Sequence, residues 1–239
     1  MIICKNCGAE VNTNYCPECG QAASEGRYNF KHLVKDILDV FFKFKDTIFP
    51  TIADSIKSPA ITTHQYLNGK RVDVYNPIKY VFFLALINSF LILQFKLLDA
   101  YLKSQDVVQN TITKFYTSNI SLVEMMSIPI LSLFSFLFFK DKKFNYSENV
   151  ILNCFLNGNV FIFGIVLSFI QLVFRQNSAL IILTNEYFNY LSMLYMAIVY
   201  MYFFNEKTLK GFLVSAIVVV LNYLVYGILL GFISNFFTK

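Results

Sequence analysis

The sequence contains no tryptophan, only nine glycines and five prolines in 239 residues, and a charged fraction of 15%. The shortage of glycine and proline excludes collagen-like and low-complexity chains. The shortage of charge excludes an ordinary soluble domain, in which about 25% of residues are charged. Apolar side chains take their place, since 56% of residues are hydrophobic, 27 are Phe and the mean hydropathy is +0.53. This composition is typical of a protein with several membrane-spanning helices.

Catalytic signatures are also scarce. The two histidines, His32 and His64, both precede the first long apolar segment, and the sequence has no GxSxG, HExxH or phosphate-binding glycine motif. We therefore expect no enzymatic activity, and a membrane enzyme ranks last among the functions considered.

Charge divides the chain near Lys79. Eighteen of the first 79 residues are charged, but only 17 of the next 160. We predict an all-α polytopic membrane helix bundle over residues 80–239, preceded by a cysteine-rich module (1–26) and a water-facing or interfacial segment (27–79). Nothing before Cys4 reads as a secretory signal, so the N-terminus is expected to stay in the cytoplasm.

Four of the five cysteines lie in two CxxCG motifs within the first 20 residues: Cys4, Cys7, Cys16 and Cys19. Each motif places two sulfurs on one tight turn, and the eight residues between the motifs let the turns bring four thiolates to one tetrahedral ion. The module has few large apolar side chains, so its folding free energy must come mainly from the ion, about 10–16 kcal/mol for structural zinc. We expect a zinc ribbon holding a structural Zn²⁺; two disulfides or a rubredoxin-like iron site are the alternatives.

The module is acidic, because residues 1–26 carry Lys5 against Glu10, Glu18 and Glu25. A net charge of −2 is the wrong sign for a phosphate-binding surface, so no nucleic-acid partner is expected. Binding of a protein partner, or structural closure alone, fits better.

Three short helices are predicted between the module and Lys79, at 30–44, 47–56 and 60–68, the last closing on Gly69. Residues 27–79 have a net charge of +4, which suits anionic lipid headgroups; packing on the cytoplasmic end of the bundle is the equal alternative. Lys70 and Arg71 precede the first apolar run, where basic residues anchor topology. A lipid-headgroup or anion site on this pair is the second interpretation.

Apolar length predicts five spans, at about 80–98, 120–139, 150–174, 187–204 and 211–237. The stretch Ala179–Leu183 is too short to span, and it would cap the third span or re-enter the bilayer. Gly227 and Gly231 have the GxxxG spacing that permits close helix approach, so this face is a candidate for homo-oligomer contact. With the N-terminus inside, eight basic residues around the spans lie in the cytoplasm and five outside, in agreement with the positive-inside rule.

The spans lack the pairs of Asp, Glu, His or Arg that are typical of coupled transport. Asn153 and Asn157 share one face of the third span, with Asn159 beside them, and Glu124 lies near the start of the second. Hydrogen bonding between helices is the expected role of these residues, and a substrate or ion path is the alternative. Cys154 has no partner thiol and is expected to pack in the core.

The order of these features resembles a known family. The matching features are the two cysteine motifs with Gln21, an amphipathic stretch, and then Pro59, Tyr66, Gly69-Lys70-Arg71, Tyr75 and Pro77. Over roughly residues 1–95 the chain resembles the bacterial zinc-ribbon membrane proteins grouped as DUF3667, although it has Pro59-Ala60 where members commonly have Pro-Gly. The resemblance implies the architecture and a bacterial inner-membrane location, and it leaves the activity open.

Two functional hypotheses follow. The first is a non-enzymatic scaffold or regulator whose cytosolic zinc ribbon binds a protein partner. The alternative is a transporter or lipid-handling protein, in which Asn153, Asn157 and Glu124 line a path and Lys70 and Arg71 hold an anionic headgroup.

Overall fold

The computed structural model describes residues 2–23, 26–38, 47–95, 120–174 and 177–237, and 74% of these described residues are helical. At the N-terminus β1 (Ile2–Ile3) pairs antiparallel with β2 (Glu10–Val11). The elements that follow are α1 (Phe30–Leu38), α2 (Ile48–Lys57), α3 (Pro59–Leu67), α4 (Pro77–Phe95), α7 (Ile120–Met125), α8 (Ser127–Phe138), the 3₁₀ turn η2 (Lys140–Lys142), α9 (Tyr146–Val173), α10 (Ser178–Phe203) and α11 (Leu209–Phe237).

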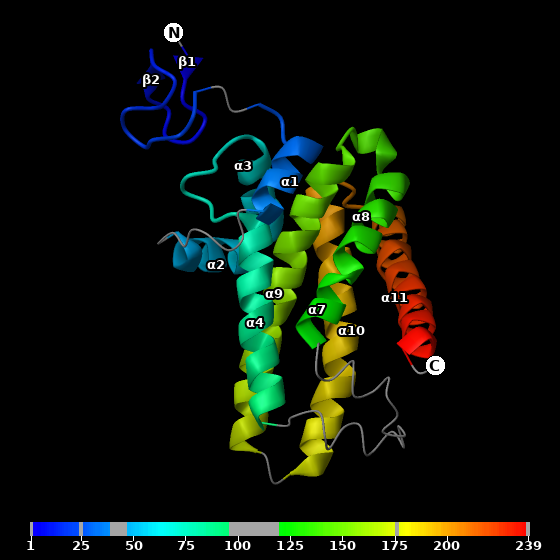
Figure 1. Cartoon of the computed structure of the whole chain (residues 1–239). Coiled ribbons are helices and arrows are strands. Elements are labelled where there is room, and N and C mark those ends of the chain that lie inside the picture. The colour runs from blue at the N-terminus through cyan, green and yellow to red at the C-terminus, as the bar shows by residue number, and fades with distance from the viewer. Residues whose placement is uncertain (1, 24–25, 39–46, 96–119, 175–176, 238–239) are drawn as a thin grey trace.

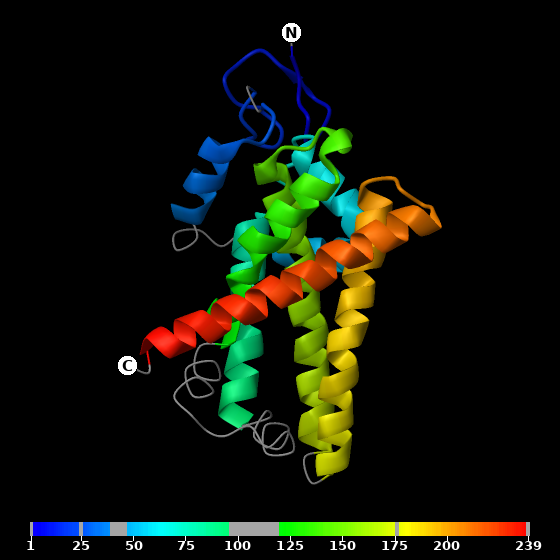
Figure 2. The ribbon, with the colours of Figure 1, turned by 90° about the vertical axis from the view of Figure 1, so that its right-hand side faces the viewer.

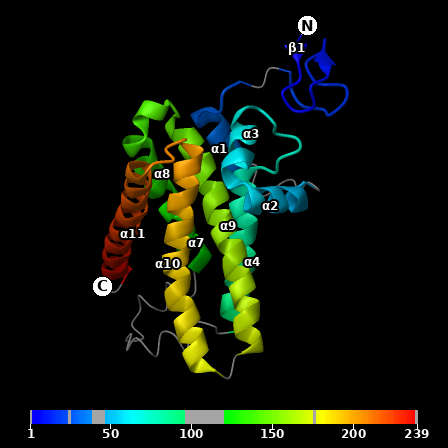
Figure 3. The ribbon, with the colours of Figure 1, turned by 180° about the vertical axis from the view of Figure 1, so that it is seen from behind.

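The long helices form a bundle around α9. Figures 1 and 3 show α4 and α9 side by side, with α10 and α8 also against α9, while α11 packs on α8 and α10. Figure 2 shows that α11 crosses the other helices obliquely. Within the described ranges three helices, α4, α9 and α11, are long and apolar enough to cross a membrane.

The outer surface of the bundle is apolar, as lipid requires. Phe90 on α4, Val173 on α9 and Phe232 on α11 are all exposed, whereas Tyr80 and Phe155 are fully buried between the helices. Large apolar side chains on the outside and polar groups within are typical of a membrane protein. The membrane class predicted from composition is therefore supported, while the count of five spans stays a prediction.

The second predicted span is two helices. α7 ends at Met125 and α8 begins at Ser127, because Pro129 has no N–H with which to donate to the carbonyl of Met125. At the break the hydroxyl of Ser127 donates a hydrogen bond to the carbonyl of Glu124 (2.7 Å). The change of direction leaves Glu124 on a short helix that ends within the bundle (Figure 1).

The helix at the fourth predicted span, α10, begins at Ser178, earlier than the predicted 187. Ala179–Leu183 forms the first turns of α10 and not a separate cap or re-entrant segment. The side chain of Asn177 fixes this start, because its oxygen accepts a hydrogen bond from the N–H of Leu180 (3.0 Å). The polar residues Thr184, Asn185 and Glu186 conceal the continuity of the helix in the sequence.

The short helices before the bundle lie close to their predicted positions. α1 occupies 30–38 of the predicted 30–44, and residues 39–46 lie outside the described part of the chain. α2 and α3 match their predictions within two residues, and Gly69 follows α3 with a φ of +106°. At this positive φ a residue with a Cβ is strained, so glycine suits this turn. Residues 96–98 of the first predicted span also lie outside the described part.

The cysteine-rich module and three connections between helices lie at one end of the molecule. Figure 1 places there the module, the start of α4, the turn between α8 and α9, and the turn between α10 and α11. The basic residues of these segments include Lys79, Lys140, Lys143, Lys207 and Lys210. Their position on the module side is the arrangement expected if this end faces the cytoplasm.

Candidate metal centre and polar sites of the bundle

Each CxxCG motif folds as the same tight turn. In the first, the N–H of Gly8 donates to the carbonyl of Cys4 (2.9 Å). In the second, the N–H of Gly20 donates to the carbonyl of Cys16 (2.9 Å). Both glycines have a positive φ, +80° and +73°, which explains why glycine follows each cysteine pair.

The two turns bring all four thiols together. The sulfur atoms of Cys4, Cys7, Cys16 and Cys19 lie within 4.8 Å of one another. The Cys4 and Cys19 sulfurs are 3.6 Å apart, and those of Cys7 and Cys16 are 3.5 Å apart. Four ligands around a tetrahedral ion with Zn–S bonds of about 2.3 Å would be about 3.8 Å apart, so the cluster fits such an ion. No disulfide joins the described cysteines, so the disulfide alternative is not the arrangement found.

Local hydrogen bonds prepare one thiol for metal binding. The backbone N–H groups of Cys7 and Asn6 point at the sulfur of Cys4 and lower the pKa of Cys4 to about 6. A thiolate at this position is the form that binds a soft divalent ion. Four sulfur ligands would close the coordination sphere of zinc, which is the pattern of a structural and not a catalytic centre. The identity of the metal stays a prediction.

The module is attached to the turn between α3 and α4. The side-chain amide of Gln21 donates to the carbonyl of Gly69 (2.7 Å) and accepts from the N–H of Arg71 (3.1 Å). The oxygen of Asn6 accepts from the N–H groups of Val72 and Asp73, both at 3.2 Å. These four hydrogen bonds connect both CxxCG turns to the segment that leads into the membrane.

The predicted basic pair is part of the same junction. The guanidinium of Arg71 lies over the rings of Tyr28 (5.4 Å) and Tyr66 (5.8 Å) and donates to the carbonyl of Gly26 (2.9 Å). The ammonium of Lys70 lies 3.7 Å from the carboxylate of Asp73. The structure thus gives Arg71 a packing role under the module, which neither sequence interpretation contained.

A second attachment joins the segment after the module to α9. Arg27 donates two hydrogen bonds of 2.6 Å to the carboxylate of Glu148 and a third to the carbonyl of Lys143. Glu148 also completes a capping box with Asn145 at the start of α9. The Asn-x-x-Glu spacing is a readable helix-start signal, but its partner Arg27 lies 121 residues away and could not be found from the sequence.

The polar stripe of α9 is mainly an interhelical hydrogen-bond network. The amide of Asn153 donates to the hydroxyl of Ser132 (3.1 Å) and to the carbonyl of Asn149 (2.9 Å), and its oxygen accepts from Tyr200. Cys154, next along the helix, is buried in the core, as expected. The geometry therefore supports the interhelical role for Asn153 and not the path role.

Asn159, two residues after Asn157, is the centre of a second hydrogen-bond network. Its oxygen accepts from Tyr80 (2.6 Å) and from the hydroxyl of Ser55 (2.9 Å), while its amide donates to the carbonyl of Ser55 (3.0 Å) and to the hydroxyl of Tyr195 (2.8 Å). One buried side chain therefore joins α2, α4, α9 and α10. Beside it, Gly158 lets the ring of Tyr80 approach the α9 backbone.

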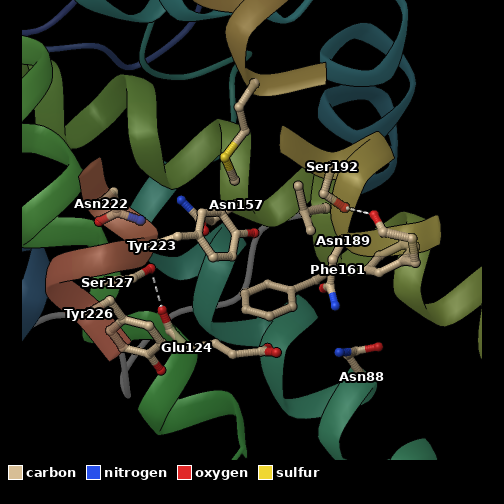
Figure 4. A pocket seen from close by; sticks show the side chains of 13 residues that line it. Asn88, Glu124, Ser127, Asn157, Phe161, Asn189, Ser192, Asn222, Tyr223 and Tyr226 are labelled. Carbon is tan, nitrogen blue, oxygen red and sulfur yellow. Dashed lines mark hydrogen bonds between the residues drawn. The ribbon is translucent and has the colours of Figure 1, made fainter. Parts of the chain in front are cut away.

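Glu124 and Asn157 do meet in one place. Both line a pocket of about 130 Å³, together with Asn88 from α4 and Asn222 from α11. Figure 4 shows these side chains around the pocket, with the Glu124 carboxylate extending toward Asn88. Asn153 is not among the lining residues, so the three polar residues predicted for a common path are divided between a closed network and a pocket.

The histidines have structural surroundings. His64 stacks on the ring of Phe203 at 4.3 Å, and its Nε2 lies 3.1 Å from the Phe203 carbonyl. His32 lies against the side chain of Asn29.

Comparison of this chain with family models, with curated proteins and with solved structures gave no match.

Proposed function

We propose that the chain is a non-enzymatic scaffold or regulator of the bacterial inner membrane, whose N-terminal module holds a structural Zn²⁺ and docks a cytosolic protein partner. The observation that supports this proposal is the one-sided attachment of the module. Gln21 and Asn6 are occupied by the turn at 69–73, while large apolar side chains elsewhere on the module are exposed.

The exposed side chains are Ile2, Ile3 and Tyr15, with exposed fractions of 52%, 64% and 64%. Three such residues in a module of this size favour contact with another protein, because well-packed interfaces use aromatic and aliphatic anchors. Glu10 and Glu18 are also exposed. The partner that fits is a protein surface with an apolar patch bordered by Lys or Arg.

The docking proposal is tested with a variant that keeps the metal. Wild type and an Ile3→Ser/Tyr15→Ser variant are purified in mild detergent, and zinc content and co-purifying proteins are measured on the same samples. We expect one zinc per chain in both and loss of a specific partner in the variant only. Asn12→Ser, a change at an exposed polar position of the module, is the matched control and should keep the partner.

A Cys16→Ser/Cys19→Ser variant tests the metal separately. It should lose the zinc and, with it, the partner. If zinc is lost while the same proteins are recovered, the module does not dock them and the proposal fails. Recovery of the partner with the Ile3→Ser/Tyr15→Ser variant contradicts the proposed surface.

A second candidate function, transport or lipid handling, is favoured by one observation, the shared pocket of Glu124 and Asn157. Membership of the DUF3667 family and homo-oligomer contact through Gly227 and Gly231 remain proposals. In support of the latter, the added Cβ of an alanine at either glycine would meet nothing within 4 Å among the described residues.

A further inference from the structure

The helix α2 lies across the bundle and not along it. Figures 1 and 3 show α2 crosswise to α4 and α9, at the side of the bundle. It packs on α3 and on α9. A helix that lies crosswise to membrane-spanning helices runs along the plane of the membrane, and its function depends on its depth and on the residues that it exposes.

Three different faces run along α2, each made by residues three or four apart in the sequence. The first face is buried against the rest of the protein: Ile48, Thr51 and Ser55. The second face is exposed and apolar: Phe49, Ala53 and Ile56. The third face is exposed and carries two charges of opposite sign: Asp54 and Lys57. The ring of Phe49 is 77% exposed, so this face lacks the cover that aromatic side chains have in a folded core.

The buried face is held at two different heights on the bundle. The hydroxyl of Thr51 accepts a hydrogen bond from the N–H of Tyr75 (2.8 Å), which precedes the start of α4 at the module end. Ser55 exchanges two hydrogen bonds with Asn159, in the middle of α9. Thr51 therefore marks the module side of α2, and Ser55 marks the side farther from the module.

These two contacts orient the exposed faces. Asp54 lies beside Thr51 on the helix surface and Ile52 lies beside Ser55, because residues three apart are neighbours around a helix. Ile52 in turn adjoins Phe49 and the apolar face. The charged face is thus on the side of α2 nearer the module, and the apolar face is on the side away from it.

The helix α9 gives the depth of α2. Asn159 lies fourteen residues before Val173, where α9 ends, and the sequence has no charged residue between Glu148 and Arg175. At about 1.5 Å per residue Asn159 is about 21 Å from this end, so a hydrocarbon core of about 30 Å extends about 9 Å past it toward the module. An interfacial helix buries its apolar face about 5–10 Å within such a boundary.

From this arrangement we propose that α2 is embedded in the lipid leaflet on the module side, with Phe49, Ala53 and Ile56 among the acyl chains and Asp54 and Lys57 at the headgroups. Lipid fits this face because the face lies at bilayer depth and points away from the charged side of the same helix. Through Ser55 the helix would hold the membrane boundary at one height on α9. The proposal concerns α2 alone, so its failure would leave the metal module and its docking role untouched.

The chain contains no tryptophan, so a single substituted Trp reports its own surroundings. Phe49→Trp and Ile56→Trp place the probe on the apolar face, and Asp54→Trp on the charged face is the matched control. Variants that elute as wild type does on size exclusion are reconstituted in phosphatidylcholine vesicles. Quenching of the fluorescence is measured with lipid brominated on its acyl chains and with iodide present on both sides of the vesicle.

Two reference variants define the limits of the measurement. Leu86→Trp, exposed in the middle of α4, reports the acyl chains, and Tyr15→Trp, exposed on the module, reports water. Bromolipid should quench Phe49→Trp about as strongly as Leu86→Trp, with bromine near the headgroup more effective than bromine near the chain end, because α2 lies at shallow depth. Iodide should quench Asp54→Trp at least about threefold more than Phe49→Trp, since only the charged face meets water.

The proposal is overturned if iodide quenches Phe49→Trp as strongly as Tyr15→Trp, which would place the apolar face in water. It is overturned as well if neither agent quenches Phe49→Trp and Ile56→Trp, because a second copy of the chain or another protein would then cover the face. Equal quenching of Phe49→Trp and Asp54→Trp by both agents would contradict the orientation of α2.

Discussion

Replacing Asn159 by Leu should loosen the whole end of the bundle. The substitution keeps the volume of the side chain but removes four hydrogen bonds, two from Tyr80 and Ser55 to the amide oxygen and two from the amide to Ser55 and Tyr195. At about 0.6 kcal/mol for each interhelical hydrogen bond in a membrane protein, the loss is at least about 2 kcal/mol. Orphaned hydroxyls raise it to about 5 kcal/mol, because each buried polar group left without a partner has its own cost.

The assay is the temperature at which half of the detergent-purified protein remains monodisperse on size exclusion. For a chain of this length the loss corresponds to a decrease of roughly 5–15 °C. Asn185→Leu is the matched control, since the amide of Asn185 donates within its own helix, to the carbonyl of Ile181. That change should lower the midpoint by no more than about 3 °C.

A double substitution tests whether the hydroxyl of Tyr80, left without an acceptor, lowers the stability of the Asn159→Leu protein. Tyr80→Phe removes the hydroxyl that Asn159→Leu leaves without an acceptor, so the double variant should be more stable than Asn159→Leu alone by about 1 kcal/mol. If Asn159→Leu and Asn185→Leu have equal midpoints, or if Tyr80→Phe destabilises the Asn159→Leu protein further, the reasoning about this hydrogen-bond centre is refuted.

Three further outcomes are expected. Gly158→Ala should lower the stability of the protein by about 1–3 kcal/mol, because the new Cβ would overlap the ring of Tyr80. Gly227→Ala, with open space around the added Cβ, should leave the midpoint of the same assay unchanged or raise it. Equal midpoints for the two variants would contradict the packing at Gly158. Gln21→Ala should keep the zinc yet speed hydrogen exchange at the N–H of Arg71, which loses its acceptor; unchanged exchange would mean that the junction is held by other contacts. Removal of the metal with a chelator should make the module sensitive to protease, while the circular dichroism signal of the helices changes little. A large loss of helical signal would show that the ion stabilises the bundle as well.

The features predicted correctly from the sequence are those set by neighbouring residues. The CxxCG turns form where the motif indicates, because each cysteine pair and its glycine act within five residues. The end of α3 just before Gly69 follows from the same kind of local signal. The apolar character of α4 and α9 is equally readable, since a run of about twenty mostly apolar positions is typical of a helix that spans a bilayer.

The features that sequence reasoning misses depend on partners distant in the chain. The sequence neighbours of Arg71 favour a role as membrane anchor or headgroup ligand. In the fold its guanidinium packs instead on the rings of Tyr28 and Tyr66, which are distant from it in the sequence. Asn88 and Asn222 have no sequence signal, since a single asparagine in an apolar helix gives no sign of the helix that it will face. Pro129 is visible, but whether it bends the helix or breaks it depends on the packing of α7 and α8.

The hydrogen bonds between Arg27 and Glu148 have a consequence for the order of events on the ribosome. The module contains its own metal ligands within 20 residues, so it is able to fold soon after it emerges. More than a hundred further residues, which include α4, α7 and α8, are then synthesised before Glu148, the partner of Arg27, is present. Until α9 has been made, the module has its hydrogen bonds to the turn at 69–73 but lacks this second attachment. Closure of this contact therefore marks a stage at which more than half of the chain has been made, and a truncated product ending before Glu148 would lack the second attachment of the module.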